Sequence, residues 1–186
     1  MKSFWKKCKP YFDKKDLVIF DLDETLVKTE RLHELSYYLA ESFIWEDETL
    51  RYQASQDQSI LYKTKCEFYL QLLESENLEF NEPIYEIYKA IKRTDKKMAL
   101  ATSTTSQNAK LILEKCKLDF DLVLTGDDFK ENNKPSPDMF LSACEHFNIS
   151  RYNTIIIEDS PNGFKAAEEA NISYIDANNL RCQILL

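Results

Sequence analysis

The chain has 186 residues, of which 44% are hydrophobic and 30% are charged, and this composition excludes a disordered or low-complexity protein. A chain of this length buries roughly 70% of its unfolded surface on folding, so one core can stabilise it without disulfides or structural metals. The net charge of −8 and the pI near 4.9 disfavour a nucleic-acid-binding surface for the chain as a whole.

Residues 1–15 form a basic N-terminal arm with six lysines against one aspartate. Aromatic residues are interleaved with the lysines, so the arm could contact RNA or an acidic partner; we favour a solvated arm whose aromatics pack locally. The arm lacks the apolar run of a signal peptide, and no apolar run of about 18 residues occurs in the chain. We expect a cytoplasmic protein, monomeric or weakly dimeric, without a membrane or nucleic-acid partner.

Short apolar runs bounded by polar residues predict the strands of the fold. These runs occupy residues 16–22, 97–102, 121–125, 154–158 and 172–176. Continuous apolar runs suit strands that are buried on both faces, as in a parallel sheet. Amphipathic stretches of helical length separate the later runs, at residues 105–117, 137–147 and 161–170. This alternation predicts a doubly wound parallel α/β sheet.

The interval between the first two runs breaks this rhythm. Residues 27–81 contain no convincing strand but carry helical periodicity, with Leu32, Leu35, Leu39 and Phe43 recurring at threes and fours. One crossover helix needs far fewer residues, so a helical subdomain inserted after the first strand is the economical explanation. We therefore expect a cap at residues 29–81 and a core at residues 16–28 and 82–186, which resumes with a helix over 82–93.

Cysteine and glycine usage bears on structure more than on function. The five cysteines are widely spaced and include no CxxC pair, so we expect reduced and mostly packed thiols. Glycine is scarce, with only Gly126 and Gly163, and some of the eleven asparagines should take left-handed turn positions instead.

The ends of the predicted strands carry the candidate functional residues, because ligands of an open α/β sheet bind outside the carboxyl ends of its strands. In chain order they are Asp21 and Asp23, the hydroxyl run 102–105, Lys134, and Glu158 with Asp159. Four carboxylates in one place need a counter-charge, and oxygen ligands of this kind suit Mg²⁺. Lysine, hydroxyls and a helix N-terminus would hold anionic oxygens. The sequence therefore predicts a pocket for phosphate and Mg²⁺.

Four stretches in this order resemble the motifs of the haloacid dehalogenase-like superfamily. They are FDLDETLVKTE, ALATSTT, NKPSPDMF and IIIEDSPNGFKAA. The resemblance covers residues 16–26 and 82–176 and is greatest to the β-phosphoglucomutase-like and phosphoglycolate-phosphatase-like branch, whose cap also follows the first strand. It implies a Rossmann-like core with a small helical cap.

The resemblance also implies catalytic roles. Asp21 would be the nucleophile that forms an aspartyl-phosphate, and Asp23 the general acid/base. Thr102 and Lys134 would complete the catalytic set and bind phosphate, with Ser103 contributing to the phosphate site. The implied activity is hydrolysis of a small phosphomonoester: a sugar phosphate, phosphoglycolate or a nucleotide.

The cofactor implied by the resemblance is Mg²⁺. Its ligands would be the Asp21 carboxylate, the Asp23 main-chain carbonyl and Asp159, with Glu158 binding directly or through water. Without a cation and a lysine, an anionic carboxylate would be repelled by a phosphate dianion.

Some features depart from the family pattern or suggest other functions. Glu24 stands where glycine is common. The first motif also resembles that of phosphatases acting on the RNA polymerase C-terminal tail. Those phosphatases have no cap after the first strand, however, and their fourth motif is Asp-Asp, which this chain does not match. A phosphosugar mutase would need a sugar-reading cap loop, which residues 51–59 do not match. A non-catalytic binding protein of the same fold would usually have lost one of the acids, all of which are present.

The two histidines are the remaining candidates. His33 aligns with a histidine near the cap hinge in some relatives, but a lone histidine on a helix is more often structural. We expect His146 on the surface of a helix.

Overall fold

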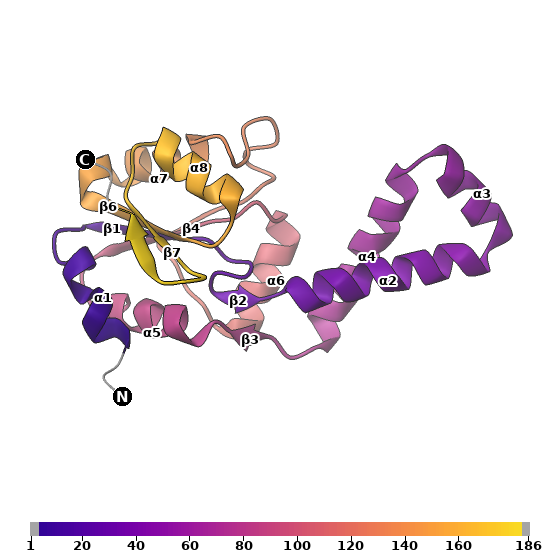
Figure 1. Ribbon diagram of the computed structural model, residues 1–186, viewed down its shortest axis with the longest axis horizontal. Helices are drawn as coiled ribbons and strands as arrows, with labels where there is room; N and C mark the ends of the chain where they lie inside the picture. Colours follow the sequence, from indigo (N-terminus) through magenta and orange to yellow (C-terminus); the bar gives the residue numbers. More distant parts are fainter. Residues whose placement is uncertain (1–3, 184–186) are drawn as a thin grey trace. The chain divides into compact units, whose positions relative to one another are not determined.

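The computed structural model describes residues 4–183, and its main sheet has six strands in the order β5-β4-β1-β6-β7-β8 (Figure 1). The strands are β1 (Leu17–Phe20), β4 (Lys97–Ala101), β5 (Leu122–Leu124), β6 (Thr154–Glu158), β7 (Tyr174–Asp176) and β8 (Arg181–Gln183). Neighbouring strands from β5 to β7 pair in parallel, and β8 pairs antiparallel with β7. The predicted parallel α/β sheet is confirmed; the antiparallel edge strand was not predicted.

The two central strands are apolar because both of their faces are covered. Every residue of β1 and β6 is buried. Leu17 aligns with Lys97 of β4 on one side and with Thr154 of β6 on the other. This register brings the carboxyl ends of β1, β4 and β6 to the same edge of the sheet.

Helices lie on both faces of the sheet (Figure 1). Helices α7 (Asp138–Phe147) and α8 (Pro161–Glu169) pack on one face, where the core cluster joins their side chains to Leu17 and Ile19. On the other face Phe20 contacts the ring of Tyr88 from α5 (Glu82–Ile91). Helix α6 (Ser106–Cys116) connects β4 to β5, and a short 3-10 turn (Arg151–Asn153) precedes β6.

Part of the N-terminal arm is helical. Helix α1 (Phe4–Phe12) packs against α5, and Cys8 and Phe12 are buried. Its lysines Lys6 and Lys9 are exposed. The apolar side of this helix therefore belongs to the core, which a merely solvated arm would not show.

The chain divides into two compact units, one comprising the described residues to Val27 together with those from Phe80, and the other Lys28–Glu79. The boundary falls within a two-stranded sheet of β2 (Val27–Lys28) and β3 (Glu79–Phe80). Neither short strand was predicted, because two residues carry no periodicity. We refer to Lys28–Glu79 as the cap.

The cap consists of α2 (Glu30–Glu46), α3 (Glu48–Gln56) and α4 (Ser59–Ser75). Asp47 begins α3 by accepting a hydrogen bond from the Leu50 amide. The buried stripe of α2 is Leu32, Ser36, Ala40 and Ile44, whereas Phe43 is 52% exposed. The predicted stripe was therefore one position out of phase, because small residues face α4 where the two helices pack.

Within residues 4–183, no helix combines the length and the apolar character needed to cross a membrane. Cys8, Cys66, Cys116 and Cys144 are free thiols, as expected. Nothing is described for the side chain of Cys182. His146 is exposed on α7, also as expected.

Candidate active site

The carboxyl ends of β1, β4 and β6 carry the residues predicted to perform chemistry. Asp21 follows β1 directly, and its amide donates a hydrogen bond to the Ile157 carbonyl of β6. Thr102 follows β4, and its amide donates to the Leu124 carbonyl of β5. Backbone hydrogen bonding between neighbouring strands thus fixes the positions of both side chains.

Lys134 is the centre of a buried charge cluster. Its Nζ donates to Asp21 Oδ1 at 2.7 Å, to Glu158 Oε2 at 2.9 Å and to the Ala101 carbonyl at 2.8 Å. The side chains of all three charged residues are at most 9% exposed. Two carboxylates can be buried together here because one ammonium group bonds to both.

Glu158 is held from both sides. Its Oε1 accepts hydrogen bonds from the hydroxyl of Ser160 at 2.6 Å and from the Ser160 amide at 3.3 Å, while Oε2 accepts from Lys134. The backbone of Gly163 lies so close that a Cβ there would come within 2.0 Å of Glu158 Cδ. These contacts leave the Glu158 carboxylate little freedom to move.

Asp159 lies beside this cluster and has its own supports. Its Oδ1 accepts a hydrogen bond from the Thr25 hydroxyl at 2.8 Å, and its main-chain carbonyl accepts one from Asn178 Nδ2 at 2.7 Å. Thr25 stands in the first motif and Asn178 after β7, and neither was predicted as a site residue. The DxDxT spacing was the available signal for Thr25.

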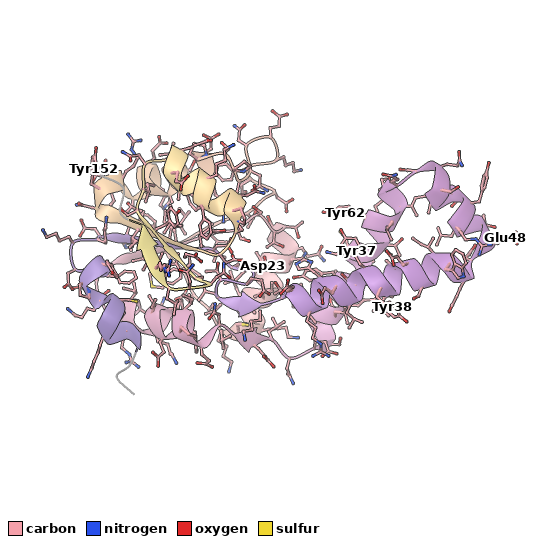
Figure 2. All side chains as sticks on the ribbon, in the orientation of Figure 1. Asp23, Tyr37, Tyr38, Glu48, Tyr62 and Tyr152 are labelled. Carbon is pink, nitrogen blue, oxygen red and sulfur yellow. The ribbon has the colours of Figure 1, made fainter. Side chains whose placement is uncertain are left out.

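Thr102 and Asp23 face each other at the rim of the cluster. Thr102 Oγ1 lies 3.5 Å from Asp23 Oδ2 and accepts a hydrogen bond from the Thr104 amide at 3.2 Å. Asp23 is partly exposed, whereas Thr102 is buried. Figure 2 marks Asp23 among the side chains of this unit.

Ser103 is engaged by a neighbouring loop. Its hydroxyl donates to Asn133 Oδ1 at 2.7 Å, and the same oxygen accepts the Lys134 amide at 2.8 Å. Asn133 therefore ties the loop after β4 to the loop that carries Lys134. Sequence reasoning missed Asn133, although it stands next to Lys134 in the third motif.

Burial and neighbouring charges shift the pKa values of three groups in the cluster. Burial raises the pKa of Asp21 well above its usual range, and the charge of Glu158 raises it further, against the opposing effect of Lys134. Burial is also the main cause that raises the pKa of Asp159 to about 6. For Lys134, burial alone would lower the pKa, but the charges of Asp21 and Glu158 outweigh it and raise the pKa.

Carboxylate oxygens of Asp21, Glu158 and Asp159 lie within 4.8 Å of one another and could hold a metal ion. Hard oxygen donors in excess of the local positive charge fit a divalent cation such as Mg²⁺. The Asp23 carboxylate is not part of this group among the described residues; its expected contribution was a main-chain carbonyl.

Comparison with known proteins decides the family. The family model described as "Haloacid dehalogenase-like hydrolase" matches residues 18–177. The chain belongs to this family. Its membership confirms the resemblance seen in the four motifs and the expectation of a hydrolase.

Relatives within the haloacid dehalogenase-like family include named phosphatases. "Phosphorylated carbohydrates phosphatase" of Thermotoga maritima is 30% identical over 181 residues, covering 86% of this chain and 83% of the relative. "Protein CbbY" of Cereibacter sphaeroides is 25% identical over 191 residues, again covering 86% and 83%. The crystal structure of CbbY from Rhodobacter sphaeroides in complex with xylulose-1,5-bisphosphate has a TM-score of 0.71 at 22% identity, covering 87% of this chain and 85% of that one. The last similarity supports the fold.

Proposed function

We propose that this protein is a Mg²⁺-dependent phosphatase that hydrolyses a small phosphomonoester through an aspartyl-phosphate on Asp21. The observation that carries the proposal is the buried Asp21–Lys134–Glu158 cluster with Asp159 beside it. Membership of a family whose relatives are named for phosphorylated compounds supports it.

The cluster suits Asp21 to attack phosphorus. Lys134 bonds to Oδ1, and Oδ2 has no hydrogen-bond partner among residues 4–183, so this oxygen is available as the nucleophile. When bound, Mg²⁺ would be held by Asp21, Asp159 and the Asp23 carbonyl, with Glu158 beside them, and would reduce repulsion between carboxylate and phosphate. Lys134 neutralises charge on the same approach path.

Asp23 and Thr102 would complete the reaction. As the Asp21 Oδ2–phosphorus bond forms and the bond to the leaving oxygen breaks, Asp23 gives that oxygen its proton. In the second step Asp23 takes a proton from water, whose oxygen attacks phosphorus and releases Asp21 and inorganic phosphate. The Thr102 hydroxyl would bond to a phosphoryl oxygen throughout.

The substrate would be a small phosphorylated compound, such as a sugar phosphate, phosphoglycolate or a nucleotide. Hydrolysis is favoured over a mutase reaction because residues 51–56 continue helix α3, where a mutase would carry a sugar-reading loop. All acids of the four motifs are retained, which favours an enzyme over a binding protein.

Turnover of an aryl phosphate tests the proposal. We expect the wild type to hydrolyse the aryl phosphate with Mg²⁺ and to lose this activity with EDTA. Asp21→Asn should be inactive, and the turnover rate of Asp23→Asn should be lower by roughly 10²–10⁴-fold. Asp119→Asn, at a side chain that is 78% exposed, should behave like the wild type.

Acid quenching should trap a phosphoenzyme that is absent from Asp21→Asn. Full turnover by folded Asp21→Asn would refute the nucleophile, and inactivity toward aryl, sugar and nucleotide phosphates would favour a binding protein.

A further inference from the structure

The cap exposes large aromatic side chains on its helices. Trp45 is 70% exposed, Tyr62 61% and Tyr37 43%. Figure 2 shows Tyr37 of α2 and Tyr62 of α4 on the same side of α2, with Tyr38 pointing to the opposite side. Concentrated exposed aromatic surface on a small unit is typical of a binding surface, since tryptophan and tyrosine contribute much of the energy of protein interfaces.

These aromatic rings border a groove of about 640 Å³ formed by α2, α3 and α4. We call it the cap groove. Its apolar residues are Tyr37, Ile44, Trp45, Ala54, Leu61 and Tyr62. Glu41 and Gln58 are its polar residues, and no lysine or arginine of the described part of the chain lines it. An apolar side chain could therefore be buried in this groove, but an anionic one would meet a carboxylate.

A second hollow of about 350 Å³ adjoins the cap groove and shares Glu41 and Trp45 with it. Its other lining residues are Ser42 and Glu46. Two carboxylates next to an indole ring form a site for a cationic group, which would gain ion pairing and a cation–π contact. The Arg51 guanidinium lies 4.9 Å from the centroid of the Trp45 ring and donates a hydrogen bond to the Trp45 carbonyl. These contacts hold the indole ring in place, although Arg51 itself lines neither hollow.

The spacing of three residues that α2 contributes to the cap groove sets the length of the occupant. Tyr37, Glu41 and Trp45 recur every four residues along α2, so they span about 12 Å of helix at 1.5 Å per residue. Two turns of a second helix cover the same distance. Such a helix can place an apolar and a cationic side chain three or four residues apart, one in each hollow.

We propose that the cap groove binds an amphipathic basic helix of a partner protein. The overall charge of the cap favours this occupant, because residues 28–79 contain eleven acidic against five basic residues. That net charge would attract a basic segment and repel a second acidic copy of the cap.

Binding of a fluorescent helical peptide to the 186-residue chain tests the proposal. The probe is a 14-residue peptide with leucine on one face and lysine three or four residues away, and its control carries glutamate instead of lysine. We expect saturable binding of the lysine peptide only, weakened by salt. Trp45→Ala, Glu41→Lys and the groove-filling Ala54→Trp should each lower the affinity by about tenfold or more. Tyr152→Ala should leave it unchanged, since Tyr152 is 65% exposed on the other unit.

Several outcomes would overturn the proposal. The proposal is wrong if the lysine peptide does not bind the folded protein. It is also wrong if the peptide binds Ala54→Trp and Trp45→Ala as tightly as the wild type, because the peptide would then bind elsewhere. Equally tight binding of 4-phenylbutylamine would assign the groove to a compact cation. Self-association that is lost in Trp45→Ala would assign it to a second copy of this chain. Circular dichroism of each variant separates lost binding from lost folding.

Discussion

Lys134 shows how one side chain can determine the arrangement of several others. Its ammonium group bonds to Asp21, Glu158 and the Ala101 carbonyl, which come from the ends of β1, β6 and β4. Each carboxylate would be costly to bury alone, since removing one partner of a buried pair typically costs about 3–5 kcal/mol. The Asp21 carboxylate is therefore positioned by the same contacts that make its burial tolerable.

Gly163 has a comparable role on the other side of Glu158. A Cβ at this position would lie 2.0–2.2 Å from Glu158 atoms, so Gly163→Ala must displace that carboxylate and break its bonds to Ser160 and Lys134. We expect the substitution to lower the free energy of unfolding by about 1–3 kcal/mol and to lower kcat by about tenfold or more. Urea unfolding and aryl phosphate turnover measure the two effects.

Lys165→Ala is the control for Gly163→Ala, because Lys165 lies on the same helix with its side chain 63% exposed. It should change stability by less than about 0.5 kcal/mol. Unchanged turnover in Gly163→Ala would show that the position of Glu158 is not important for activity.

Several site residues could be predicted from the sequence and others could not, for a physical reason. Asp21, Lys134 and Asp159 stand at strand ends or in loops of a parallel sheet, so topology alone places them at one edge. The Asn133 bond to Ser103 and the Thr25 bond to Asp159 depend on the exact path of loops, which no periodicity encodes.

The backbone explains where the chain departs from its family. Glu24 has φ of 58°, in the left-handed region that favours glycine, which is the residue that the family resemblance led us to expect there. Asn148 and Asn171 also have positive φ, as expected from the scarcity of glycine. Leu180 was not anticipated at such a position.

At the scale of elements, the central strands could be predicted because they are buried on both faces. The shortest strands could not, because they form only where the folded chain brings a pairing partner beside them. β1 and β6 are continuous apolar runs, but β2, β3 and β8 have only two or three residues each. The helical stripe of α2 shifted because the buried positions Ser36 and Ala40 carry small side chains rather than large apolar ones. Hydrophobicity alone does not indicate where helices pack closely.

Helix α1 makes a testable contribution to the core. Phe12 is 1% exposed and its ring contacts Trp5 within the same helix. We expect Phe12→Ala to lower the free energy of unfolding by about 3–5 kcal/mol, because it removes a buried aromatic ring and leaves a cavity. Tyr11→Ala, at 40% exposure, should cost much less. Equal unfolding midpoints for Phe12→Ala and wild type would show that α1 does not stabilise the core.

The cap helices contain a pH-sensitive pair. Lys65 Nζ lies 2.8 Å from His33 Nδ1, and the His33 ring stacks on Tyr69 at 4.0 Å. Burial and, secondarily, the charge of Lys65 lower the pKa of His33 from 6.5 to about 4. Between these values the unfolded state binds a proton that the folded state does not, so His33 reduces stability as the pH falls from 6.5 to 4.

The difference between wild type and His33→Gln isolates this effect. Between pH 6.5 and pH 4, the free energy of unfolding of the wild type should fall by about 1–2 kcal/mol more than that of His33→Gln. This figure is below the full value of the pKa shift because the His33 ring is partly exposed. Parallel pH profiles for wild type and His33→Gln would contradict the assignment.

At the scale of the whole molecule, the acidic cluster should couple metal binding to stability. The folded state holds Asp159 with a pKa of about 6, above its usual 3.8, so it binds more protons than the unfolded state between these values. Without metal, stability contributed by this group therefore falls as the pH rises from about 4 to 6. This slope is opposite in sign to that of His33.

Mg²⁺ should counteract that loss. At about 100 times its dissociation constant, a ligand of the folded state adds about 2.7 kcal/mol, which corresponds to a rise in Tm of roughly 5–10 °C for a chain of this size. We expect the rise to be larger at pH 7.5 than at pH 5, because protons compete for the same carboxylates. Thermal unfolding with Mg²⁺ or EDTA measures it; an undiminished rise in Asp159→Asn would place the metal elsewhere.

The cap leaves and re-enters the core at nearly one point. The Asn81 amide donates to the Leu26 carbonyl at 3.0 Å, and Asn81 Nδ2 donates to the Glu24 carbonyl at 3.3 Å. A short turn could bridge this gap as readily as a folded insert, since lengthening a flexible connection from about 4 to about 50 residues costs only about 2 kcal/mol. The insert can therefore be exchanged for another one without changing the register of the sheet. Both evolution and protein engineering could use this junction as a grafting site that accepts a different insert on the same core.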